Sequence, residues 1–147
     1  MAYKDPPLYN IDQAVGPGAP NRRTDVMLVQ FFLREIYAHP DFVAVKPPGT
    51  MQVDGLFGST TATWIDAWQK LLKTRGKPVI ADGRVDPVSS DSWDARTGNG
   101  GKRYTFWHLN SSFRRRFLRR HDHLESDGAV PGELTIALRT QEAAIAG

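Results

Sequence analysis

Three aspartates stand directly before a glycine, at Asp54, Asp82 and Asp127. A carboxylate can act as a general acid or base, so each aspartate is a candidate catalytic group. An aspartate before glycine also accepts hydrogen bonds from the backbone amides that follow, and the glycine tolerates a positive φ. We therefore expect the three aspartates to hold turns. Glu35 has no second acidic residue at a spacing that acid–base chemistry would use, and we predict that the protein is not an enzyme.

Histidine and carboxylate side chains, both suitable zinc ligands, occur together in the segment His121-Asp122-His123. Residues i and i+2 point apart on a helix, and the chain has no His-Glu-x-x-His pattern. The chain also contains no cysteine, which excludes a disulfide framework, a thiolate nucleophile and a cysteine-bound zinc. We expect no metal and no cofactor, and we interpret this segment as a solvated helix end.

Basic residues are concentrated in one segment of the 147-residue chain, whose net charge is only +3. Positions 102–120 contain seven Lys and Arg and no acidic residue. We expect these arginines to contact a partner: Arg114, Arg115, Arg116, Arg119 and Arg120. Arginine clusters bind phosphates, but the aromatic residues here face inward at helical spacing and form no stacking platform. Nucleic acid is therefore less favoured than a protein partner or an anionic cell envelope.

Helices must position these residues, because apolar residues recur at helical spacing and strand-like alternation is scarce. The sequence predicts an all-α fold. The first helix, over residues 26–37, has Asn21 or Thr24 as its N-cap, and a short third helix begins at Pro87. Residues 104–107 are expected to be extended. The other expected helices cover residues 59–73, 110–121 and 131–144.

Proline and glycine divide the chain into three regions. Residues 1–20 form a Pro/Gly-rich arm, from which Tyr3, Leu8, Tyr9 and Ile11 could dock on a core. Residues 21–97 form a helical domain, and residues 98–147, after a Gly/Asn-rich hinge, form a basic helical region packed on it. This last region is also interpretable as a degenerate second copy of the first. The chain has no run of about 18 apolar residues, so we expect no membrane span.

Two complete Asp-Gly motifs lie between the expected helices. The first is Asp54-Gly55-Leu56-Phe57-Gly58, followed at helical spacing by Thr61, Ile65, Trp68 and Gln69. The second is Asp82-Gly83-Arg84-Val85-Asp86-Pro87, and both follow a helix with Val26, Val29, Gln30 and Leu33. This order resembles the peptidoglycan-binding-domain family, small three-helix modules appended to many bacterial and phage cell-wall enzymes. The resemblance covers about residues 21–96. It implies a compact three-helix bundle with glycine turns, in which Phe57 and Val85 are driven into the core.

The resemblance also implies a function: non-catalytic adsorption to wall peptide or glycan through a shallow groove between helices. The residues expected to bind the ligand are Gln52, Thr60 and Trp64, the last as an aromatic platform. An alternative is a structural adaptor of a phage tail, contractile or secretion assembly, whose basic C-terminal half grips a partner. The first residues lack the apolar core of a signal peptide. A wall-binding protein of this kind would therefore be made in the cytoplasm and delivered by lysis, by injection or in a particle.

Overall fold

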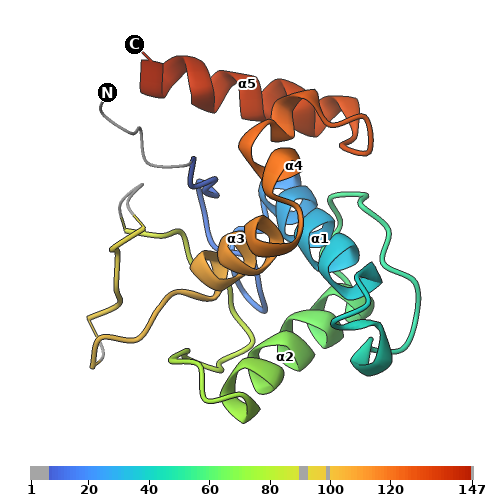
Figure 1. Ribbon diagram of the computed structural model, residues 1–147, viewed down its shortest axis with the longest axis vertical. Coiled ribbons are helices and arrows are strands. Elements are labelled where there is room, and N and C mark those ends of the chain that lie inside the picture. The colour runs from blue at the N-terminus through green and yellow to red at the C-terminus, as the bar shows by residue number, and fades with distance from the viewer. Residues whose placement is uncertain (1–6, 90–92, 99, 147) are drawn as a thin grey trace.

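The computed structural model describes residues 7–89, 93–98 and 100–146. It confirms the all-α class (Figure 1). The helices of the described residues are α1 (Arg23–Ala38), α2 (Ser59–Thr74), α3 (Thr105–Arg116), α4 (Leu118–Asp122) and α5 (Gly132–Ala146). Two 3-10 turns, η1 (Val43–Val45) and η2 (Leu124–Ser126), lie in the connections. None of these helices is long and apolar enough to cross a bilayer.

The first helix, α1, lies at the centre of the molecule, between α2 and α5 and beside α3 (Figure 1). It is apolar on nearly all sides and contains no glycine or proline, as a buried helix requires. Its Phe31 and Phe32 rings contact the Phe113 ring of α3, with centroids 6.0 and 5.1 Å apart. The two halves of the sequence therefore share one hydrophobic core, which runs from Leu8 to Leu138.

The start of α1 ties down the N-terminal arm. No side chain caps the helix, whose N-cap residue is Arg22, so the predicted Asn21 or Thr24 cap is wrong. The carboxylate of Asp25 is buried and accepts hydrogen bonds from the backbone amides of Asp12 and Gln13, at 2.9 and 3.0 Å. Leu8, Tyr9 and Ile11 are buried, as expected for a docked arm, and Tyr3 lies outside the described residues.

The predicted helix at Pro87 is wrong within the described residues, because residues 87–89 and 93–98 are not helical. Long-range contacts hold the backbone on both sides of Pro87 instead. Val85 forms an antiparallel bridge with Val15, through hydrogen bonds of 2.7 and 2.9 Å. The side-chain amide of Asn10 then donates a hydrogen bond to the Val88 carbonyl and accepts one from the Val88 amide, each at 2.9 Å. The arm thus supplies the hydrogen-bond partners of this stretch before and after Pro87.

The helix predicted over residues 110–121 begins earlier and is broken. Residues 105–107, expected to be extended, form the first turn of α3. Phe117 leaves the helical conformation, with φ −135° and ψ 57°, and separates α3 from α4. By contrast, α2 and α5 begin within one residue of the predicted positions. α2 ends at Thr74, and Gly76 follows its C-cap residue with a φ of +72°, which glycine adopts without strain.

Candidate functional site

A buried glutamine of α1 holds the first Asp-Gly turn. Gln30 Oε1 accepts hydrogen bonds from the amides of Asp54 and Gly55, at 3.1 and 2.9 Å. Its Nε2 donates to Asp54 Oδ1, to the Leu56 carbonyl and to the Thr61 hydroxyl, at 3.0 to 3.1 Å. Asp54 Oδ1 also accepts from the Leu56 amide at 3.0 Å, as expected for an aspartate that holds a turn. One side chain thus connects α1, the turn and the start of α2.

A second glutamine repeats this arrangement one helix later. Gln69 of α2 accepts from the Gly83 amide at 2.7 Å. It donates to the Arg84 carbonyl and to the hydroxyl of Thr105 at the start of α3, both at 2.9 Å. Asp82 accepts from the Arg84 amide at 3.0 Å. The sequence analysis identified Gln30 and Gln69 only as residues that match the family motif. In the structure each accepts a hydrogen bond from the glycine amide of an Asp-Gly turn.

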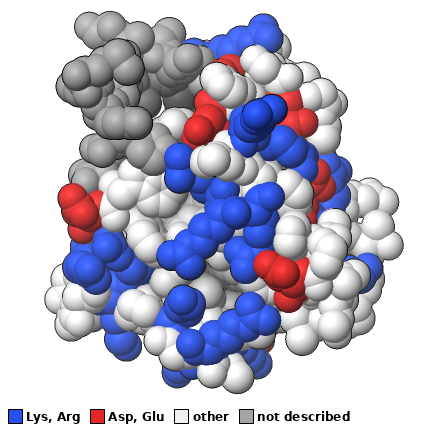
Figure 2. Space-filling model, viewed as in Figure 1, with Lys and Arg blue, Asp and Glu red and all other residues white. Residues whose placement is uncertain are grey.

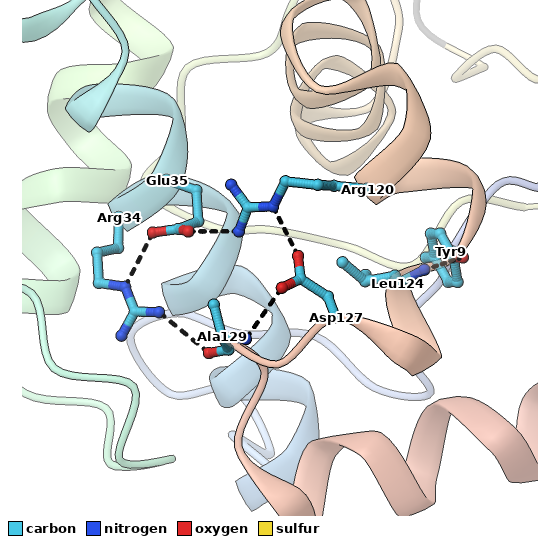
Figure 3. A network of polar contacts seen from close by, with 7 residues as sticks. All are labelled: Tyr9, Arg34, Glu35, Arg120, Leu124, Asp127 and Ala129. Atoms are coloured by element: carbon cyan, nitrogen blue, oxygen red, sulfur yellow. Dashed lines mark hydrogen bonds and ion pairs between the residues drawn. The ribbon is translucent and has the colours of Figure 1, made fainter.

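The third Asp-Gly turn is held by charge instead (Figure 3). Asp127 accepts from the Ala129 amide at 2.9 Å and from Arg120 Nε at 2.7 Å. Arg120 also pairs with Glu35 of α1, and Glu35 pairs with Arg34 at 3.2 Å. Asp54, Asp82 and Asp127 are therefore turn residues, and Glu35 is an ion-pair partner. No group of three or more His, Asp or Glu among the described residues is placed to hold a metal ion.

A groove of about 340 Å³ lies beside the first turn. We call it the Gln52 groove; it is lined by residues 50–52, 54, 56 and 58–61 and by Gln30. The structure thus brings together Gln52 and Thr60, two of the residues predicted to bind a ligand. Sequence reasoning did not name Thr50, Met51, Leu56 or Ser59 as ligand-binding residues, although Leu56 lies within the first Asp-Gly motif.

The Gln52 groove is polar and carries a single ionisable side chain, Asp54. The hydrogen bond from the Leu56 amide lowers the pKa of Asp54, so its carboxylate stays ionised at neutral pH. The remaining polar groups are hydroxyls and amides, and Leu56, 65% exposed, offers one apolar contact. Hydrogen bonding rather than charge would select a ligand here.

The prediction that Trp64 lines the groove is wrong, because its side chain is buried. The ring packs edge-on against Tyr37, with centroids 5.5 Å apart. Its Nε1 donates to the Pro48 carbonyl at 3.0 Å, and Lys46 covers it from the loop before α2. That long loop folds back over the ring and removes it from solvent. Val85, in contrast, is fully buried as expected, and Phe57 is partly buried against the core.

The five arginines predicted to contact a partner have different environments. Arg114 pairs with Asp122 at 3.3 Å and Arg116 with Asp41 at 3.1 Å, while Arg120 belongs to the network of Figure 3. Arg115 and Arg119 are exposed and have no carboxylate within 4.0 Å among the described residues. Figure 2 shows other Lys and Arg side chains around α3, with acidic residues at the edges of this face. Only part of the predicted cluster is thus available to a partner.

The interpretation of residues 121–123 as a solvated helix end is wrong for His121, whose side chain is fully buried. Its Nε2 lies 3.0 Å from Asn110 Oδ1, and its ring packs edge-on against Tyr9. Burial lowers the pKa of His121 to about 4, so the imidazole is neutral at physiological pH. His121 is a core residue that helps to dock the arm.

The chain matches no protein-family model, and no curated protein or solved structure is significantly similar to it.

Proposed function

We propose that this protein is a non-catalytic binding module, which adsorbs to wall peptide or glycan through the Gln52 groove. The observation that supports this function is the convergence of Gln52, Thr60 and the first Asp-Gly turn on one polar groove. Its hydroxyl and amide groups match a ligand rich in hydroxyls or peptide groups. The turn itself is rigid, because Gln30 makes five hydrogen bonds to it and to α2. A preformed groove loses little entropy on binding.

The affinity of the groove for one ligand unit is expected to be modest. No aromatic side chain lines it, since Trp64 is buried beneath the neighbouring loop. Stacking on a sugar ring is therefore absent, and hydrogen bonds to a solvated ligand contribute little net free energy each. Adsorption to an insoluble polymer suits such a site, because many ligand units are close together.

The test is retention on purified sacculi at 50 and 500 mM salt. We expect the double variant Gln52→Ala/Thr60→Ala to reduce retention about tenfold, the effect of losing one or two hydrogen bonds. The matched control Gln13→Ala/Thr74→Ala changes the same residue types at exposed positions outside the groove and is expected to behave like the wild type. Failure of the folded wild type to bind at either salt concentration, or unchanged retention of the groove variant, would contradict the proposal.

A second candidate function is that of an adaptor in a phage tail, contractile or secretion assembly. Exposed Arg115 and Arg119, without carboxylate partners among the described residues, favour it. Ion pairs between these arginines and a partner would weaken as the salt concentration rises, whereas the affinity of the Gln52 groove, which depends on hydrogen bonds, would fall only slightly. Co-purification of a partner that is lost in Arg115→Gln/Arg119→Gln, without retention on sacculi, would support the adaptor.

A further inference from the structure

A second groove lies beside the second Asp-Gly turn. It has a volume of about 190 Å³ and is lined by Ile80, Thr97, the turn residues 82, 84 and 86, and residues 103–105. We call it the Arg103 groove. It is smaller than the pockets of about 300–1,000 Å³ that bind drug-sized ligands, so its ligand would be short.

The Arg103 groove is built on the same scaffold as the Gln52 groove. Each contains the aspartate of an Asp-Gly turn and the threonine, Thr61 or Thr105, that a buried glutamine holds. Val85, fully buried and bridged to Val15, also fixes the second turn. The second groove thus also lies on a turn that buried residues hold in place.

Charge distinguishes the two grooves. The Arg103 groove is lined by two aspartates and two arginines, whereas Asp54 is the only ionisable residue of the Gln52 groove. Arg84 and Asp86 pair with each other at 3.0 Å, both partly exposed. Arg103 makes no ion pair with the described residues.

Neutral groups hold Arg103 in place. Its Nη1 donates to the carbonyls of Trp93 and Ala95, at 2.7 and 2.9 Å. Its guanidinium carbon lies 4.4 Å from the centroid of the Trp107 ring. Within the described residues no hydrogen bond uses Nε or Nη2. Burial, together with the charge of Arg96, lowers the pKa of Arg103, and the negative charge of Asp94 opposes this shift without cancelling it.

We propose that the Arg103 groove binds the C-terminal carboxylate of a short peptide, with Arg103 as its cationic partner. A planar guanidinium whose orientation is already fixed binds a carboxylate through parallel hydrogen bonds. Asp82 and Asp86 in the same lining repel a polyanion, which favours a ligand with one negative charge over nucleic acid or polyphosphate. This site is separate from the Gln52 groove and does not depend on the function proposed for it.

The experiment is an NMR titration of the full, ¹⁵N-labelled chain with N-acetyl-alanyl-alanine. The matched ligand is its C-terminal amide, which differs only in the carboxylate. We expect saturable shifts of the amide signals of Arg84, Arg103 and Tyr104, and binding of the amide weaker by about tenfold or more. Absence of these shifts, or equal binding of acid and amide, would overturn the proposal.

The variant Arg103→Gln tests the assignment of the cation and is expected to weaken binding about tenfold or more. The control Lys102→Gln removes the same charge from an exposed neighbour that does not line the groove, and binding is expected to stay within about twofold. Equal effects of the two variants would refute a specific role of Arg103. If Arg103→Gln fails to fold, the proposal is still tested by comparing the affinities of the wild type for the dipeptide acid and for its C-terminal amide. Gln52→Ala/Thr60→Ala must still bind the dipeptide, which separates this proposal from the one on sacculi.

Discussion

Substitution of Gln30 by alanine tests whether a single buried side chain holds the first turn. The change removes five hydrogen bonds. Water can replace part of those to Asp54 and Leu56, which lie nearer the surface. The Gly55 amide and the Thr61 hydroxyl are buried, and each unsatisfied group costs about 1–3 kcal/mol. We expect the free energy of unfolding to fall by about 3 kcal/mol.

Gln30→Glu distinguishes the hydrogen bonds that Gln30 donates from those that it accepts, because the new side chain has nearly the same size and leaves no cavity. The new carboxyl can still accept from Asp54 and Gly55, but it cannot donate when ionised, and it faces the Asp54 carboxylate. Burial and this neighbour raise its folded-state pKa above the value of about 4.3 for free glutamate. The destabilisation is therefore small below pH 4.3 and grows as the pH rises through the folded-state pKa.

Urea denaturation, followed by tryptophan fluorescence and by circular dichroism, measures both effects: at pH 7 for Gln30→Ala, and at a series of pH values from 4 to 7 for Gln30→Glu. Coincident transitions would establish two-state unfolding. The control Gln13→Ala lies on the exposed surface and is expected to change the free energy of unfolding by less than about 0.5 kcal/mol. A loss below about 1 kcal/mol for Gln30→Ala, with an unchanged m value, would refute the role assigned to this glutamine.

Gly55→Ala is expected to cost about 2–3 kcal/mol, because φ is +75° and a Cβ would lie 2.9 Å from a backbone oxygen of α1. Gly58→Ala, where a Cβ meets nothing within 4 Å, should cost less than about 0.5 kcal/mol, and equal losses in thermal unfolding would contradict this reasoning. Arg120→Ala removes the only ion-pair partner of Asp127 among the described residues and one of the two partners of Glu35, and should cost about 2–3 kcal/mol. Arg119→Ala, at an exposed position, should be nearly neutral in urea denaturation. The pKa of His121 is about 4 in the folded protein and 6.5 in the unfolded chain. The free energy of unfolding therefore has its full value above pH 6.5 and decreases as the pH falls from 6.5 toward 4, because the unfolded chain binds the proton first. The complete decrease is about 3 kcal/mol. His121→Gln should lack this part of the pH dependence, so the wild type and the variant should differ in how the free energy of unfolding changes with pH. Parallel pH profiles for the two proteins would contradict the role of His121.

Features that depend on neighbours in sequence were predictable. The helical periodicity of residues 59–73 indicated α2, and Gly76 indicated its end. The Asp-Gly pairs indicated turns, and each aspartate accepts from the amide two residues later. These patterns are legible because the interacting groups are close along the chain.

The stretch after the second turn was not predictable from local pattern. Asp86-Pro87 is a good helix start by composition, yet Asn10 bonds the backbone of Val88 from 78 residues away. A similar long-range contact joins Asn110 to both backbone polar groups of Tyr9, at 3.0 and 2.9 Å. Single asparagines carry no periodicity, so the sequence contains no sign of these pairings.

For the candidate site, the sequence alone determined that Gln52 and Thr60 flank a turn before a helix, because both positions follow from the local motif. Whether a side chain near them faces solvent was decided only by tertiary structure. Trp64 was expected to be an aromatic platform in the groove, but the loop that carries Pro48 folds over it and accepts the hydrogen bond of its indole. Likewise, arginines that are adjacent in sequence differ in availability, since Arg116 meets Asp41 from another part of the chain while Arg115 stays exposed. Local pattern determines which groups are present on a helix, and packing between distant segments determines which of them remain accessible to a ligand.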